Sequence, residues 1–178
     1  TFDFTKLNTK PKVTVQEAIG ELYTLDKIPT DFLLNKPSNN YTKYLRTENQ
    51  KLYNHEIKYP AEMTQKRISH VPQGGNWQNI PIDLFPNNRK NRHSSAYKRL
   101  DENTCSVTID TGNAHSNYFH PLYNRIPTVR EAARIQSFKD DFILEGSRTS
   151  QYRQIGNAVP PLLAKTVALS LKKYLDTK

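Results

Sequence analysis

The sequence lacks several features that define common classes of protein. It has a single cysteine, Cys105, which excludes an internal disulfide and is typical of a cytosolic protein. No apolar run approaches the roughly 18 residues that a membrane span needs. The first residues show no signal-peptide pattern, and repeats and low-complexity tracts are absent. We therefore expect a soluble, cytoplasmic protein.

The familiar catalytic and metal-binding motifs are also missing. There is no GxGxxG or other glycine-rich phosphate loop, no HExxH or CxxC spacing and no GxSxG elbow. None of the five histidines pairs with a carboxylate at a catalytic spacing. Cys105 is expected on the apolar face of a strand, where a thiol stays protonated and packs as a small hydrophobe. The sequence thus predicts no catalytic residue and no metal site in this chain.

What the sequence does have is positive charge and a small apolar share. Hydrophobic residues make up 35% of the 178 residues, which predicts a modest core and buried surface contributed partly by another polypeptide. The formal net charge is +9. Residues 64–99 hold seven basic side chains and one acidic one. The net positive charge of this stretch is two thirds of the net charge of the chain. Asparagine, glutamine, histidine and tyrosine are interleaved there, so the stretch suits a nucleic-acid face, while a solvated basic surface is the alternative.

Local patterns predict helices at both ends and a partly β middle. A capping box at residues 14–17 opens a helix that Pro29 ends, and a second box at residues 128–131 opens another. Apolar and polar residues alternate over 104–110, which predicts a half-buried strand. The last helix is expected to begin near Asn157, with an apolar stripe through Leu163 and Leu171.

The stretch before that last helix has two interpretations. Residues 154–161 read QIGNAVPP, and a glycine and an asparagine placed before a helix can hold backbone amides open at its positive end. Such an end attracts carboxylates and phosphates. The alternative is a tight helix entry with Asn157 as its cap.

Longer motifs resemble a known family. Residues 125–138, RIPTVREAARIQSF, resemble the ninth conserved motif of cytosine-5 DNA methyltransferases, and residues 154–161 resemble the tenth. Residues 97–100, 106–109 and 120–121 are similar to the distal part of the family's target-recognition domain. Residues 12–19 look like the helix before that domain.

The resemblance implies an α+β fold in three parts. Residues 1–28 would be a linker helix, and residues 29–124 a small basic target-recognition domain with short β-strands and loops. Residues 125–178 would be C-terminal helices, which in the family pack on a Rossmann-like, S-adenosylmethionine-dependent catalytic domain. The implied partner is double-stranded DNA, and the implied setting is restriction–modification.

Departures from the family pattern matter as much. The Pro-Cys nucleophile, the Glu-Asn-Val segment, the N-terminal glycine-rich loop and the paired-arginine motif are not in this sequence, and Lys139 stands where members usually carry proline. The chain is therefore expected to be inactive alone. It would need a larger methyltransferase subunit, or the N-terminal catalytic half of a longer gene. A non-enzymatic DNA-binding module and an RNA-binding basic protein are the alternatives.

The resemblance also implies roles for particular residues. Lys98 and Arg99 would approach phosphates or guanine edges, and Thr108 would hold the backbone beside a base swung out of the duplex. Glu131 and Arg134 would brace their helix. The amino-acid end of S-adenosylmethionine would touch Asn157 and Ala158, and Phe138 would line its pocket. The base contacts, with loop solvation as the alternative, would come from Gln73, Asn76, Asn113, His115 and Asn117.

Overall fold

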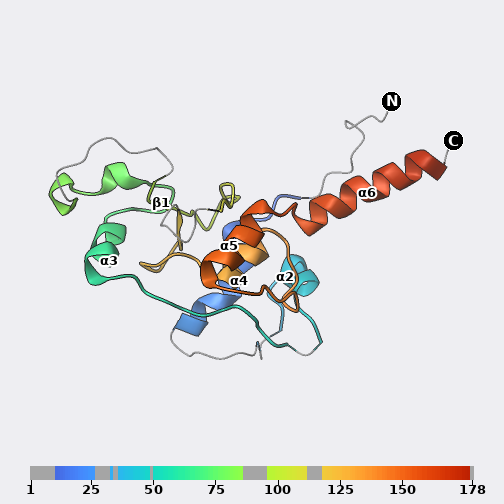
Figure 1. Cartoon of the computed structure of the whole chain (residues 1–178), viewed down its shortest axis with the longest axis horizontal. Coiled ribbons are helices and arrows are strands. Elements are labelled where there is room, and N and C mark those ends of the chain that lie inside the picture. The colour runs from blue at the N-terminus through green and yellow to red at the C-terminus, as the bar shows by residue number, and fades with distance from the viewer. Residues whose placement is uncertain are drawn as a thin grey trace.

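The computed structural model describes residues 11–26, 33, 36–48, 50–85, 96–111 and 118–176. This part of the chain is a mixture of helices and short strands, as the resemblance implies (Figure 1). The α-helices are α1 (Val15–Ile19), α2 (Asn40–Leu45), α3 (Glu62–Ser69), α4 (Val129–Ile135), α5 (Arg148–Asn157) and α6 (Pro161–Asp176). The 3-10 helices are η2 (Gly20–Asp26), η3 (Trp77–Asn79) and η4 (Ile82–Leu84). The strands are β1 (Lys98–Arg99) and β2 (Tyr118–Phe119).

Both predicted capping boxes are confirmed. The Thr14 hydroxyl accepts from the amide of Glu17, and the Glu17 carboxylate accepts from the amide of Thr14 at 2.8 Å. The same reciprocal pair joins Thr128 and Glu131 at the start of α4. The first helix continues from Gly20 to Asp26 as η2, and the predicted stop at Pro29 lies outside the described residues. Each box satisfies two amides that a helix start leaves open, so these starts are fixed locally.

The predicted strand over residues 104–110 is wrong. The observed sheet consists of β1 and β2 paired in parallel, with Lys98 opposite Tyr118. Residues 105–110 have no regular secondary structure, because no described strand pairs with them. Of the predicted inner face, Ile109 is buried, whereas Val107 is 40% exposed and Cys105 is exposed as well.

The start of the last helix also differs from the prediction. Asn157 is the final residue of α5, a helix that the sequence analysis did not predict, and α6 begins four residues later at Pro161. The Ser147 hydroxyl accepts from the amide of Ser150 and caps α5 at its start. Ala158 then takes an extended conformation and ends α5. Pro161 opens α6, where proline is accepted because its missing N–H would have no partner in the first turn.

The main core combines elements from both ends of the chain. Helix α4 packs against α1 and α5. Ala132 and Ala133 on α4 have no exposed surface, which allows the helices to approach closely. Three residues that follow β1 and precede α4 in the sequence complete this core: Leu100, Ile109 and Tyr118. The three predicted segments thus share one core, and α4 and α5 bury their apolar sides within this chain.

Helix α6 is different, because it projects away from the body, at the end opposite α3 and β1 (Figure 1). None of its residues is buried. Leu163 is 52% exposed and Leu175 is 60% exposed. The expectation that the C-terminal helices present apolar sides to another body therefore fits α6 but not α4 or α5. In the described part of the chain, no helix is long and apolar enough to cross a membrane.

Candidate cofactor and DNA site

Buried ion pairs anchor α4 to the N-terminal segment. The Arg125 guanidinium lies between two carboxylates, 2.6 Å from Asp26 and 2.7 Å from Glu131. Burial alone would raise the pKa of Glu131, but Arg125 and the nearby histidines reverse this and hold it well below its ordinary value. Arg134 pairs in the same way with Asp140 and Glu21. The bracing role expected for Glu131 and Arg134 is confirmed, and it extends from α4 to η2.

His120 lies against this network and is fully buried. Its Nδ1 accepts from the amides of Leu122 and Tyr123 at 3.1 Å each, and its Nε2 lies 3.7 Å from a Glu131 oxygen. Burial is the largest influence on the ring and lowers its pKa to about 4. A neutral ring that accepts two backbone hydrogen bonds fixes the turn after β2.

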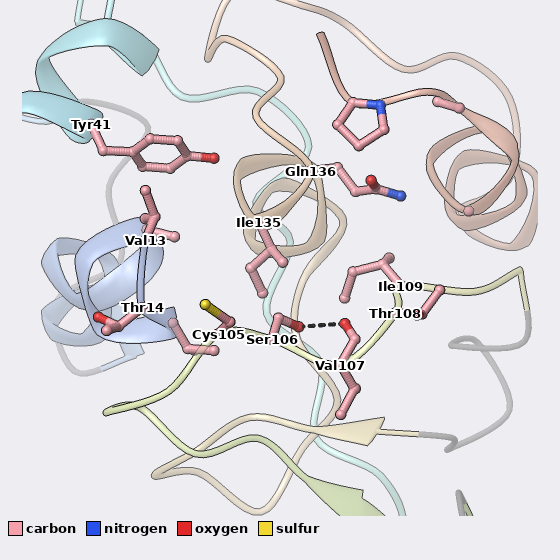
Figure 2. A pocket seen from close by; sticks show the side chains of 15 residues that line it. Val13, Thr14, Tyr41, Cys105, Ser106, Val107, Thr108, Ile109, Ile135 and Gln136 are labelled. Carbon is pink, nitrogen blue, oxygen red and sulfur yellow. Dashed lines mark hydrogen bonds between the residues drawn. The ribbon is translucent and has the colours of Figure 1, made fainter. Parts of the chain in front are cut away.

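An open pocket of about 470 Å³ adjoins this scaffold (Figure 2). One wall is the start of α1 with Tyr41 of α2, a second is the segment 105–109, and a third comes from the end of α4 and the turn between α5 and α6. The lining residues are Val13, Thr14, Val15, Ala18, Tyr41, Cys105, Ser106, Val107, Thr108, Ile109, Ile135, Gln136, Gly156, Ala158 and Pro160. Its size is typical of small-molecule sites.

The pocket brings together two of the residues singled out in the sequence. Thr108 lies on one wall and Ala158 on another. Asn157 is exposed and does not line the pocket, although its neighbours on both sides do. Phe138 packs against the main core and contacts the Phe142 ring at a tilted angle, with ring centroids 5.0 Å apart. Phe138 is therefore not among the residues that line the pocket with Ala158.

Cys105 corrects an expectation. It is exposed, and Figure 2 shows its sulfur directed into the space between Val13 and Ile135. The segment 105–109 borders the pocket along its length. The thiol is therefore accessible and does not pack as a core hydrophobe.

Arg99 is the other clear correction. Its side chain is buried, and its guanidinium donates to the carbonyls of Val71 at 2.6 Å and Ile68 at 2.7 Å. It also donates to the His120 carbonyl at 3.1 Å and to Asn124 Oδ1 at 2.8 Å. An arginine whose donors are used in this way holds three chain segments together and has none left for a phosphate. Burial lowers its pKa below the ordinary value.

The remaining DNA candidates differ in how far local structure already uses them. Lys98 is partly exposed, and its ammonium donates to the Gly74 carbonyl. The Gln73 side-chain oxygen accepts from the Glu102 amide at 2.9 Å, and Asn76 Oδ1 caps η3. Both amides thus shape the loop that contains them. Asn113, His115 and Asn117 lie outside the described residues.

Three of the lining residues had no site role assigned from the sequence, although one of them, Gly156, was noted there as part of a motif. Tyr41 donates its hydroxyl to the Arg134 carbonyl at 2.6 Å, and Gln136 donates its side-chain amide to the Ile155 carbonyl at 3.0 Å. Gly156 stands inside the QIGNAVPP motif and could have been found there. Tyr41 carries no signal, because its stretch has no clear pattern. In the residues that the structure covers, no cluster of His, Cys, Asp and Glu is suited to a metal ion.

Comparison with known proteins agrees with this architecture. The family model of C-5 cytosine-specific DNA methylases matches residues 3–173. The type II methyltransferase M.DdeI of Desulfomicrobium norvegicum is 33% identical over 156 residues, which cover 79% of this chain and 37% of that protein. The type II methyltransferase M.AquIB of a Picosynechococcus species is 34% identical over 139 residues, which cover 72% of this chain and 93% of that protein.

A solved structure described as a prophage-encoded DNA modification methyltransferase of E. coli has a similar fold. The TM-score is 0.60 at 22% identity, over 82% of this chain and 40% of that one. The chain spans about a third of M.DdeI and most of M.AquIB. Because the family model matches nearly the whole length of the chain, the chain belongs to the C-5 cytosine-specific DNA methylases.

Proposed function

We propose that this chain supplies one side of the cleft in which a cytosine-5 DNA methyltransferase brings its cofactor and its DNA together. The observation that carries the proposal is that Thr108 and Ala158 line the same pocket. By family resemblance, Thr108 lies on the DNA side and Ala158 on the cofactor side. Residues 29–124 would read the target, and residues 125–178 would join the catalytic body. A restriction–modification role in the cytoplasm follows from the same resemblance.

The pocket residues fit part of S-adenosylmethionine, which supplies the methyl group when bound. Ala158 has a small side chain that leaves its backbone accessible, and Val13, Ile135 and Tyr41 offer apolar surface for a flat ring system. None of the described residues that line this pocket is acidic, so the cationic centres of the cofactor would find their partners elsewhere. Asn157, exposed next to the pocket, remains a candidate for its amino-acid end. Phe138 would act by supporting the α4 end of the wall.

DNA would run past the segment 105–109 towards the basic middle of the chain. Thr108 is exposed and can face a phosphate or a displaced base. Lys98 adds positive charge nearby in the sequence, while buried Arg99 would hold the loop from within. Asn113, His115 and Asn117 remain proposed base contacts. Gln73 and Asn76 could offer a base only their remaining amide donors.

The attacking thiolate would come from a catalytic part on the same or another polypeptide. Cys105 has no proline before it, and the Pro-Cys pair that the family uses is not in these 178 residues. Helix α6 offers an apolar side with no buried residue, which suits packing onto that part. M.AquIB is covered over 93% of its own length, so a family member of about this extent exists as a separate chain.

The test is reconstitution of methyl transfer. The chain and a polypeptide carrying the glycine-rich loop and the Pro-Cys pair, encoded by the neighbouring reading frame, are mixed with duplex DNA and tritiated S-adenosylmethionine. We expect label in DNA only when both are present. Specific duplex binding by this chain with no transfer in the mixture would instead favour a non-enzymatic DNA-binding module, and preference for single-stranded RNA would favour an RNA-binding protein.

A further inference from the structure

We propose that Gly156 is a positioning residue that sets the separation of the two walls of this pocket. One wall is the segment 105–109, and the other is the turn after α5 that contains Ala158. The proposal rests on the proposed function, because it assigns the walls to DNA and cofactor. It adds that glycine at 156 is required for the DNA side to lie at its working distance from the cofactor side.

The evidence is the space beside Gly156. A Cβ atom there would lie 2.5 Å from the Asp110 carbonyl carbon, 2.5 Å from the Thr111 nitrogen and 2.7 Å from the Asp110 oxygen. Ordinary van der Waals contact begins at 3.4 Å. All three atoms belong to the backbone, so no side-chain rotation can relieve the clash. A residue with a Cβ must therefore push the two segments about 1 Å apart.

Backbone conformation does not explain this glycine. Gly156 lies inside α5, and only Gly74 and Gly146 have positive φ among the glycines of the described residues. Glycine inside a helix is less favourable than alanine by about 1 kcal/mol. The sequence thus places a poor helix former where any other residue could take the backbone angles. Close approach of the Asp110–Thr111 peptide is the physical reason.

The segment after Thr108, and not α5, would yield to a larger residue. Ile155 has no exposed surface and belongs to the main core, and Tyr152 is 1% exposed with its hydroxyl bonded to the Pro127 carbonyl. Residues 105–110 have no regular secondary structure, and Ile109 is the one buried residue among them. Replacing Gly156 by alanine would thus displace Thr108 while leaving Ala158 in place. Gly156 couples the two sides without contacting a reacting atom.

Gly156→Ala in the reconstituted methyltransferase tests this, with Gly20→Ala as the matched control. A Cβ at Gly20 would meet only the flexible Gln16 side chain, at 3.2 Å. Since a misplacement of about 1 Å can cost roughly 100-fold in rate, we expect kcat/KM for DNA to fall about 10- to 100-fold. The affinity for S-adenosylhomocysteine should change less than twofold, and Gly20→Ala should alter neither. Equal losses in both quantities, or an unchanged kcat/KM, would overturn the proposal.

A second measurement does not depend on activity or on the folding of a variant. In the wild-type chain labelled at glycine and threonine, nuclear Overhauser effects should connect the Gly156 α protons with the Thr111 amide proton. Their absence would overturn the proposal, even if methyl transfer is reconstituted. Their presence in a mixture that transfers no methyl group would support the contact and count against the proposed function alone.

Discussion

Replacement of His120 by asparagine should remove a large part of the acid sensitivity of this fold. The histidine ring is fully buried, and its Nδ1 accepts hydrogen bonds from Leu122 and Tyr123. An asparagine oxygen can take the place of Nδ1 and accept the same bonds, but it does not titrate. The Glu131 carboxylate lies 3.7 Å from Nε2.

The magnitude follows from the pKa of His120, which falls from 6.5 to about 4 in the folded chain, chiefly through burial. The unfolded chain binds this proton more tightly, so the contribution to stability is complete above pH 6.5 and is lost as the pH falls towards 4. At 1.36 kcal/mol per unit, the loss is about 3 kcal/mol. No discount for solvent screening applies, since the ring has no exposed surface.

Urea unfolding of wild type and His120→Asn, at steps from pH 7.5 to pH 4, measures this directly. The free energy of unfolding of wild type should fall relative to that of the variant by about 3 kcal/mol over this range. Burial also lowers the pKa of His55, but His55 is present in both proteins and cancels in the difference. A difference that stays constant with pH within about 0.5 kcal/mol, or one that grows in the opposite direction, would refute the reasoning.

Further predictions concern α6, the basic residues of β1 and the buried ion pairs. The double variant Leu163→Ser, Leu171→Ser should change the unfolding free energy of the chain by less than about 0.5 kcal/mol, because both side chains are exposed. It should nevertheless weaken binding to the catalytic part at least tenfold, as measured by calorimetry. Unchanged binding would contradict the role of α6. Lys98→Ala should reduce the slope of log affinity for duplex DNA against log salt by about one unit. Arg99→Gln, which removes the charge, should leave that slope unaltered while lowering the unfolding temperature. A lower slope for the Arg99 variant alone would show that the two assignments are reversed. Arg125→Met should cost about 3–5 kcal/mol in urea unfolding, since Glu131 would stay buried without its partner; a cost below 1 kcal/mol would contradict that pairing.

Local chemistry was the predictable part of the fold. The hydroxyl of Thr14 and the carboxylate of Glu17 lie three residues apart, so a capping box depends on almost nothing beyond the segment that forms it. The same holds for Thr128 and Glu131. The resemblance also pointed correctly to the family. It gave Thr108 and Ala158 separate roles and did not predict that they line one pocket.

Features that depend on distant segments were not predictable. Alternation over residues 104–110 describes a half-buried strand equally well whether or not another strand lies beside it, and none in the described chain does. Lys98 and Arg99 look alike in sequence. The carbonyls of Ile68 and Val71, about thirty residues earlier, bury the second side chain and leave the first partly exposed. Asn157 fits the start of one helix as well as the end of another.

Cys105 gives the most direct test of the pocket as the meeting place of cofactor and DNA. In the reconstituted methyltransferase, the alkylation rate of this exposed thiol can be followed by mass spectrometry of its peptide. S-adenosylhomocysteine and duplex DNA together should slow the reaction at least fivefold, because both would close the space that the sulfur faces. An alkylation rate that is unchanged when both are bound, as shown by an independent binding assay, would place cofactor and DNA elsewhere and contradict the account.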